Sequence, residues 1–316
     1  MKSVLLVGAG QLGSRYLQGM ARRLEATEFV AVEPNAAAIA TAKERYSQVA
    51  SRPGNTLTFI ADLKECARAF DVAIIATTSS NRLEAMREMF RHAKVGKVVL
   101  EKVLFQDRPS YHAARELLDA SRARAWVNCP RRSFDIYRQI HAFFGDDLPR
   151  RVEVSGGGWG LACNGVHFMD LAAYLFGNPP LRAEEAGLKA GALPSKRPGY
   201  LEVEGTMLVD YGSDRGLSLS SVAASTAGVL VVIRGEAKTA MIDEAGGTAF
   251  FSEPSGSWRQ EGFRIPPLSE YAGAMVERIM EEGQADIPDY EESMKVHLPF
   301  IDALSRHWGV EKCDIT

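Results

Sequence analysis

Three glycines near the N-terminus have the spacing of a loop that binds a phosphate-bearing cofactor. Gly8, Gly10 and Gly13 follow a short apolar run and precede a segment whose apolar positions have helical spacing. In such a strand–turn–helix unit the first glycine permits a tight turn, the second lets a pyrophosphate approach the backbone, and the third allows close helix–strand packing. The start of the helix then faces the phosphate charge. The pattern, with Gln11 and Leu12 inside it, predicts a dinucleotide-binding loop; the alternative is a glycine-rich turn without a ligand.

An acidic residue stands about 20 residues beyond these glycines, where a carboxylate hydrogen-bonds the ribose 2′-OH of a dinucleotide. This residue is Glu33, at the end of the second apolar run. Its charge would repel a 2′-phosphate, and neither Pro34 nor Asn35 supplies a cation to hold one. We therefore expect NAD in preference to NADP; the alternative is a solvated carboxylate at a strand end.

Polar residues also follow two later apolar runs. Thr77, Thr78 and Asn81 come after the run 71–76, and Lys102 comes after the run 97–100. Ligands of open α/β sheets bind outside the carboxyl ends of the strands. The first three side chains are therefore candidates to contact the cofactor, although residues of these types also cap helices. Lys102 could hydrogen-bond a reacting oxygen and relay a proton, or it could be an ordinary surface lysine.

A second group that could do proton chemistry lies near the middle of the chain. His167 and Asp170 are three residues apart in an apolar segment, so they share one face of an expected helix. Histidine transfers protons near neutral pH, but a helical histidine among apolar residues is more often structural. Because no further ligand stands at suitable spacing, we expect no metal site. The four cysteines, Cys66, Cys129, Cys163 and Cys313, form no CxxC pair. This argues against a zinc site or a disulfide framework and fits a reducing compartment.

The elements that must position these residues alternate in the first part of the chain. Short apolar runs alternate with helical patterns, which predicts βαβ units and a parallel sheet. With the glycine motif, this predicts a Rossmann domain over residues 1–125. The expected strands are 3–7, 29–32, 57–60, 71–76, 97–100 and 125–128, and the expected helices are 11–24, 36–46, 82–93 and 110–122.

From about residue 150 the pattern changes. Several β-rich runs are separated by Gly, Ser, Asp and Asn turns, which predicts a large, mostly antiparallel sheet in an α+β domain over residues 126–316. We expect a loop at 181–200 and final helices that pack on this sheet or back on the first domain. The expected strands are 152–155, 202–211, 216–221, 229–234 and 239–243, and the expected helices are 166–176, 268–282 and 290–308. The predicted fold class is therefore α/β, a Rossmann domain followed by an α+β domain.

Composition narrows the possible functions. The chain has 316 residues, 46% of them apolar and 24% charged, and a net charge of -3. This charge balance provides no positive electrostatic potential that would attract nucleic acid or an anionic membrane. The N-terminal apolar run is too short for a signal peptide or a membrane span. We expect a cytoplasmic protein with no nucleic-acid or membrane partner.

Together these motifs resemble the Gfo/Idh/MocA oxidoreductase family, and the resemblance extends over nearly the whole chain. It implies NAD-dependent hydride transfer at a sugar or cyclitol carbon, homodimers or homotetramers formed through the C-terminal sheet, and Lys102 and His167 as catalytic residues. Three positions depart from the family pattern: Val103 replaces a proline, Arg82 a histidine and Cys163 an aspartate. The cofactor contacts that we expect are Gly8, Gly10, Gln11, Leu12, Gly13, Glu33, Thr77, Thr78, Asn81 and Glu101.

The substrate is less constrained than the cofactor. The segments 159–164 and 313–316 look like a subgroup associated with bacterial surface-polysaccharide synthesis, so we expect a sugar or nucleotide sugar. The alternatives are a non-sugar substrate, such as a dihydrodiol or a tetrapyrrole, and a catalytically silent NAD sensor. Two neighbouring arginines could bind a carboxylate or phosphate bidentately. The candidate substrate contacts are Arg131, Arg132, Trp159, Asn164 and Asp170.

Overall fold

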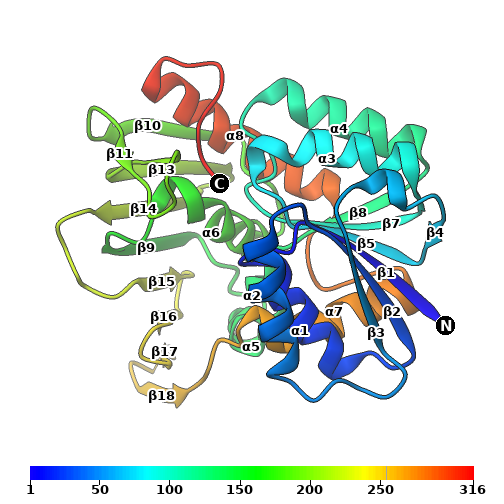
Figure 1. The fold of residues 1–316 in the computed structure, drawn as a ribbon. Coiled ribbons are helices and arrows are strands. Elements are labelled where there is room, and N and C mark those ends of the chain that lie inside the picture. Colours follow the sequence, from blue (N-terminus) through cyan, green and yellow to red (C-terminus); the bar gives the residue numbers. More distant parts are fainter. Residues whose placement is uncertain (254) are drawn as a thin grey trace. The chain divides into compact units, whose positions relative to one another are not determined.

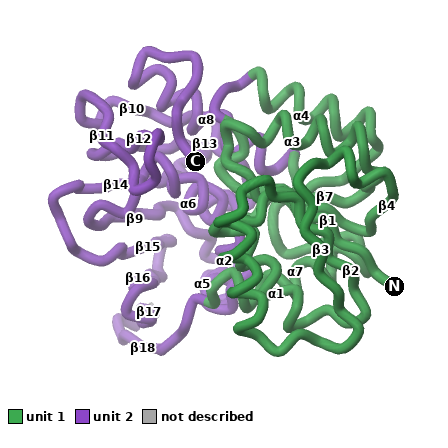
Figure 2. The backbone as a smooth tube through the Cα atoms, in the orientation of Figure 1, with its two compact units in different colours: residues 1–105, 109–128, 266–290 green, residues 106–108, 129–265, 291–316 purple. Residues whose placement is uncertain are grey.

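The structure is a computed structural model that describes residues 1–253 and 255–316. The chain divides into two compact units (Figure 2). The first unit contains residues 1–105, 109–128 and 266–290, and the second contains residues 106–108, 129–265 and 291–316. Each unit therefore includes a late segment of the chain.

The first unit is built on a parallel six-stranded sheet with the order β3-β2-β1-β5-β7-β8. The central strands are continuous apolar runs, because helices cover both faces of such a sheet. A two-stranded pair, β4 (Ala69–Phe70) and β6 (Lys94–Val95), stands beside it. The strands of the sheet are β1 (Lys2–Val7), β2 (Thr27–Val32), β3 (Thr56–Ile60), β5 (Val72–Ile75), β7 (Lys97–Leu100) and β8 (Arg124–Val127).

Helices lie on both faces of this sheet (Figure 1). Helices α1, α2 and α7 are on one face, and α3 and α4 are on the other. The short helix η1 (Leu63–Glu65) follows β3. The helices are α1 (Gly13–Arg23), α2 (Ala36–Ser47), α3 (Ser79–His92), α4 (Arg108–Ala120) and α7 (Leu268–Glu282).

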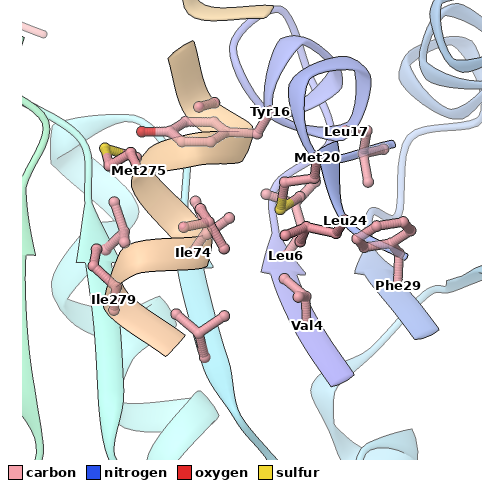
Figure 3. Packing of buried hydrophobic residues seen from close by; sticks show 14 of the residues in the cluster. Val4, Leu6, Tyr16, Leu17, Met20, Leu24, Phe29, Ile74, Met275 and Ile279 are labelled. Carbon is pink, nitrogen blue, oxygen red and sulfur yellow. The ribbon is translucent and has the colours of Figure 1, made fainter. Parts of the chain in front are cut away.

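The core of the first unit joins sequence-distant helices to the sheet (Figure 3). Tyr16, Leu17 and Met20 of α1 recur at helical spacing and are fully buried. Met275 and Ile279 of α7 belong to the same cluster. Helix α7, a late segment of the chain, therefore packs within the first unit.

The second unit is built on an eight-stranded sheet with the order β10-β13-β14-β9-β15-β16-β17-β18. Only the β14–β9 pair is parallel, so the predicted fold class, a parallel sheet followed by a mostly antiparallel one, is confirmed. The strands are β9 (Arg151–Gly157), β10 (Arg182–Leu188), β13 (Gly205–Gly212), β14 (Arg215–Val222), β15 (Leu230–Arg234), β16 (Thr239–Asp243), β17 (Thr248–Ser252) and β18 (Trp258–Gly262). The other elements are η2 (Pro130–Ser133), α5 (Asp135–Phe144), α6 (Leu161–Phe176), α8 (Tyr290–Trp308) and a small pair, β11 (Leu193–Pro194) and β12 (Leu201–Glu202).

The loop predicted at 181–200 is wrong over its first half. Strand β10 pairs there with β13, with an irregularity in register between Glu184 and Gly187 that interrupts the alternation of side chains. Helix α5 and strands β17 and β18 were not predicted. None of the described helices is long and apolar enough to cross a membrane.

Candidate functional site

The central strands of the first unit end in one row. Five strand ends are paired in register across the sheet, namely Val32, Val7, Ile75, Leu100 and Val127. The next residue of each strand therefore begins a loop at the same edge, where parallel sheets bind their ligands. These first loop residues are Glu33, Gly8, Ala76, Glu101 and Asn128.

The glycine loop has the geometry that the motif predicts. Gly8 has φ +90°, a conformation that favours glycine, and a Cβ on Gly13 would lie 1.9 Å from the carbonyl oxygen of Gly8. A Cβ on Gly10 would meet nothing within 4 Å. The middle glycine therefore borders open space directly before α1, which fits a pyrophosphate at the start of that helix.

Glu33 is held against this loop. One carboxylate oxygen accepts a hydrogen bond from the backbone N–H of Ala9 (2.9 Å), and the other accepts one from the N–H of Asn35 (3.0 Å). Each carboxylate oxygen can accept a further bond. The carboxylate thus stands at the position expected for ribose recognition and can still accept a hydrogen bond from a hydroxyl group.

A cavity of about 320 Å³ adjoins the end of β2. Its volume lies at the lower end of the range of small-molecule sites. Three carboxyl-bearing residues, Asp62, Glu84 and Glu88, are among those that line it. The pKa of Asp62 is lowered, mainly by a hydrogen bond from the backbone N–H of Lys64. Each of these carboxylates also has a cation within 4 Å, namely Lys64, Arg87 and Arg91.

The loop after β5 carries the predicted threonines. Among the described residues, the buried Thr77 Oγ1 has no hydrogen-bond partner, and buried hydroxyls are usually paired. Thr78 occupies the N-cap position of α3 but makes no side-chain capping bond there; its hydroxyl lies 3.1 Å from Ser80 Oγ. Asn81 is exposed. The capping alternative is therefore not seen at Thr78, and Thr77 offers a hydroxyl to a ligand.

Glu101 belongs to a buried hydrogen-bond network. It is 3% exposed, and its Oε1 accepts bonds from Tyr16 Oη and Asn128 Nδ2, both at 2.7 Å. Tyr271 Oη of α7 donates to Asn128 Oδ1 at 3.2 Å. Burial and the nearby Glu101 charge raise the pKa of Tyr16 well above its usual value. The carboxylate is engaged internally, so its predicted contact with the cofactor stays a prediction.

Lys102 directly follows this anchored glutamate and is half-buried. The peptide bond between Lys102 and Val103, where the family pattern has proline, is cis. Lys102 is the second residue of the loop after β7, and β7 lies next in the sheet to the strand that precedes Thr77.

In the second unit, helix α6 begins at Leu161, earlier than predicted, and carries Cys163, Asn164 and His167. The carboxylate of Glu202 accepts hydrogen bonds from the backbone N–H groups of Ala162 (2.8 Å) and Cys163 (3.2 Å). An acidic group at a helix N-terminus stabilises it through the helix dipole. Half-buried His167 lies one turn after Cys163 on this anchored helix.

Trp159 and Asn164 are both tied to backbone carbonyls. Trp159 Nε1 donates to the oxygen of Ser220 (2.8 Å), and Asn164 Nδ2 donates to the oxygen of Trp159 itself (2.9 Å). The Trp159 ring meets Phe168 edge-on, with centroids 5.4 Å apart. These contacts fix the segment before α6, and contact with a substrate stays a prediction for both residues.

The two candidate arginines are each paired with a carboxylate of the same unit. Arg131 makes two 2.8 Å bonds to Glu244, and Arg132 makes bonds of 3.0 and 2.6 Å to Asp170. Arg131 also lies 4.1 Å above the Phe168 ring. Because one edge of each guanidinium is already used bidentately, a second bidentate anion has to approach another edge. Asp170 is 1% exposed, and burial raises its pKa to about 6, although the charge of Arg132 acts in the opposite direction.

The comparison with known proteins bears first on the N-terminal part. Residues 2–127 match the Gfo/Idh/MocA sequence profile, described as an oxidoreductase family with an NAD-binding Rossmann fold. Residues 2–127 form the NAD-binding domain of an oxidoreductase. No curated protein matches the chain in sequence.

Solved structures resemble this oxidoreductase over its whole length. An oxidoreductase from Agrobacterium radiobacter, in complex with NAD+, L-tartaric acid and magnesium, has 14% identity and a TM-score of 0.73, covering 98% of this chain and 96% of that one. UDP-N-acetylglucosamine 3-dehydrogenase GnnA from Acidithiobacillus ferrooxidans has 14% identity and a TM-score of 0.74, covering 98% of both chains. A Gfo/Idh/MocA family oxidoreductase from Vibrio cholerae has 14% identity and a TM-score of 0.69, covering 97% of both. At these identities the likeness shows the shared fold.

The residues of the oxidoreductase fit NAD on three local observations: the open space at Gly10, the carboxylate of Glu33 beside the loop, and the unpaired hydroxyl of Thr77. Within the described part of the chain, no three His, Cys, Asp or Glu side chains are grouped to hold a metal ion. Sequence reasoning missed the structural partners of Glu101. Asn128 directly follows a buried strand and could have been found, whereas Tyr271 lies too far along the chain to be connected with it.

Proposed function

We propose that the protein is an NAD-dependent dehydrogenase or reductase that transfers a hydride to or from a carbon of a sugar, sugar derivative or nucleotide sugar. The observation that carries this proposal is the row of strand ends, which brings the loop of Lys102 to the edge of the sheet that holds the glycine loop and Glu33. Two of the similar structures support the substrate class. One is a UDP-N-acetylglucosamine 3-dehydrogenase, and another is in complex with L-tartaric acid.

NAD, when bound, accepts or supplies the hydride. The chain's own groups then have separate tasks. The N–H groups of the glycine loop and the start of α1 would hold the pyrophosphate, and Glu33 would accept hydrogen bonds from the ribose hydroxyls. The Lys102 ammonium holds and polarises the reacting oxygen of the substrate, and His167 takes the hydroxyl proton during oxidation or returns it during reduction.

The test is turnover of NAD(H), followed by absorbance, across a panel of sugars, cyclitols and nucleotide sugars. With a substrate from this panel, Lys102→Ala and His167→Ala should each lower kcat by about 10²–10⁴-fold, the usual contribution of a positioned acid or base. His167→Ala should leave NADH affinity unchanged. Arg138→Gln serves as a control, because its side chain is half-exposed and pairs with Asp135, which is 96% exposed. Normal turnover in both test variants would refute the two roles, and NADH binding without turnover of any compound would favour an NAD sensor.

We also propose a homo-oligomer formed through the eight-stranded sheet and, within this substrate class, a role in surface-polysaccharide synthesis in the cytoplasm. Two large apolar side chains on this sheet, Leu208 and Val222, are 51% and 52% exposed. A monomeric mass in light scattering at micromolar protein concentration would contradict the oligomer.

A further inference from the structure

Helix α3 buries an arginine in the first unit. Arg82 is 1% exposed and is the largest of the fully buried side chains. An arginine is almost never buried unless its charge and N–H groups are compensated, because removing a charge from water is costly. A buried guanidinium at the ligand-binding edge of a sheet therefore indicates a specific task.

The contacts of Arg82 join two loops. Nη1 donates to the carbonyl oxygens of Val103 and Leu104, the latter at 2.6 Å, and Nη2 donates to the carbonyl oxygen of Thr77 at 2.5 Å. Val103 and Leu104 follow Lys102 in the loop after β7, and Thr77 lies in the loop after β5. The planar guanidinium is a rigid fork, so it fixes the spacing of these carbonyl groups.

These contacts complete the support of Lys102. On its N-terminal side, Glu101 is held by Tyr16 and Asn128. On its C-terminal side, the next two carbonyl groups are held by Arg82. The Thr77 loop also borders the glycine loop, because a Cβ on Gly8 would lie 3.2 Å from the N atom of Thr77. Arg82 thus connects the backbone of Lys102 to the loop beside the predicted cofactor site.

We propose that Arg82 is a positioning residue, which fixes the Lys102 ammonium relative to the cofactor loops through the carbonyl groups of Thr77, Val103 and Leu104. This inference rests on the role of Lys102 in the proposed function. Charge adds to the geometry: the Arg82 charge lowers, and the Glu101 charge raises, the pKa of the same Tyr16 hydroxyl. Arg82 therefore also offsets part of the negative charge of Glu101.

The first experiment needs no substrate. With NADH-saturated protein, limited acetylation by acetic anhydride is followed by mass spectrometry at Lys102 and, as an internal reference, at exposed Lys94. Arg82→Gln should change the acetylation rate of Lys102, relative to that of Lys94, by about five-fold or more, because the loop loses the guanidinium that holds its carbonyl groups. The control Arg87→Gln removes an exposed arginine of the same helix, which pairs with Glu84 at 3.4 Å, and should leave the ratio unchanged.

The second experiment is a double-mutant cycle with a substrate found in the turnover panel. Arg82→Gln should lower kcat by about 10- to 100-fold, the range expected when a reacting group is misplaced by about 1 Å, while the NADH dissociation constant changes little. In the Lys102→Ala background the same substitution should change kcat by less than about two-fold, because coupled residues are not additive. Arg82→Lys keeps the charge but not the planar guanidinium, so its kcat should lie between those of the wild type and of Arg82→Gln.

The outcomes separate the two proposals. If Lys102→Ala keeps normal turnover, the role of Lys102 is wrong, while the acetylation ratio still judges whether Arg82 places that lysine. An unchanged ratio in Arg82→Gln, or equal losses of kcat in both backgrounds, overturns the inference and makes Arg82 merely structural. If Arg82→Gln does not fold, Arg82→Lys takes its place, and a wild-type acetylation ratio in that variant is the contradicting result.

Discussion

At the scale of a single residue, we propose that Glu33 sets the choice between NAD and NADP. Its carboxylate contacts the glycine loop through Ala9, and the neighbouring cavity adds the acidic Asp62, Glu84 and Glu88. Replacing Glu33 by Gln removes the charge and keeps an oxygen that can accept the Ala9 bond. We expect the preference for NADH over NADPH to shrink by about ten-fold, because repulsion of the 2′-phosphate is reduced.

The measurement is the ratio of the two dissociation constants from fluorescence titration. Glu44→Gln is the matched control, since it removes an exposed carboxylate from α2 and should leave the ratio unchanged. A wild-type protein that binds NADPH more tightly than NADH would refute the role given to Glu33.

The cysteines make a second prediction at this scale. All four are buried: Cys66, Cys129, Cys163 and Cys313. Burial raises the pKa of Cys163, and it raises the pKa of Cys313 to about 12. Because the thiolate is the reactive form, a disulfide reagent at pH 7.5 should label the thiols of the native protein slowly. After unfolding, the same reagent should label all four thiols rapidly. A thiol of the native protein that reacts as fast as free cysteine would contradict this burial.

At the scale of elements, helix α7 depends on close packing with α1. A Cβ on Gly273 would lie 2.3 Å from the carbonyl oxygen of Gly19, and a Cβ on Gly19 would lie 3.1 Å from the Cβ atom of Ala272. Gly273→Ala should destabilise the first unit by about 1–3 kcal/mol, the usual cost of overpacking a core. Thermal unfolding with and without NADH measures it. Gly96→Ala is the control, because Gly96 is exposed and a Cβ there would meet nothing within 4 Å. Equal melting temperatures of Gly273→Ala and Gly96→Ala would refute the contact.

The same packing explains which elements the sequence could predict. Strand β1 and helix α7 bury whole apolar runs or faces, so their patterns are strong. Strands β10 and β18 are edge strands rich in charged residues, and the register irregularity in β10 interrupts its alternation. Helix α5 did carry a signal, since Ile136, Tyr137, Ile140 and Phe144 are buried at helical spacing.

The candidate site divides in the same way. Its glycines and Glu33 were predictable because a local motif contains them. The bond from Tyr16 to Glu101 and those from Arg82 to Val103 and Leu104 were not, because these residues meet only through the fold. Helix propensity and periodicity hold no information on hydrogen bonds between segments that lie so far apart in sequence.

For the whole molecule, the buried pair of Asp170 and Arg132 predicts how stability varies with pH. The folded pKa of Asp170, about 6, lies above its ordinary value of 3.8. The folded state therefore binds this proton more tightly than the unfolded state does. Its contribution to stability is fully present below about pH 4 and is lost as the pH rises through about 6. Carboxylates with lowered pKa values, such as Glu185 and Glu204, act in the opposite direction at lower pH.

Comparison with Asp170→Asn isolates this contribution, because the amide does not titrate. The free energy of unfolding of the wild type minus that of the variant, from urea titrations, should fall by about 1–3 kcal/mol between pH 4 and pH 7. Asp135→Asn, at a side chain that is 96% exposed, should show no such change. A difference that rises with pH would mean that the charge of Arg132 outweighs burial and holds the pKa of Asp170 below its ordinary value. The sign of the slope therefore decides which of the two effects governs this buried pair.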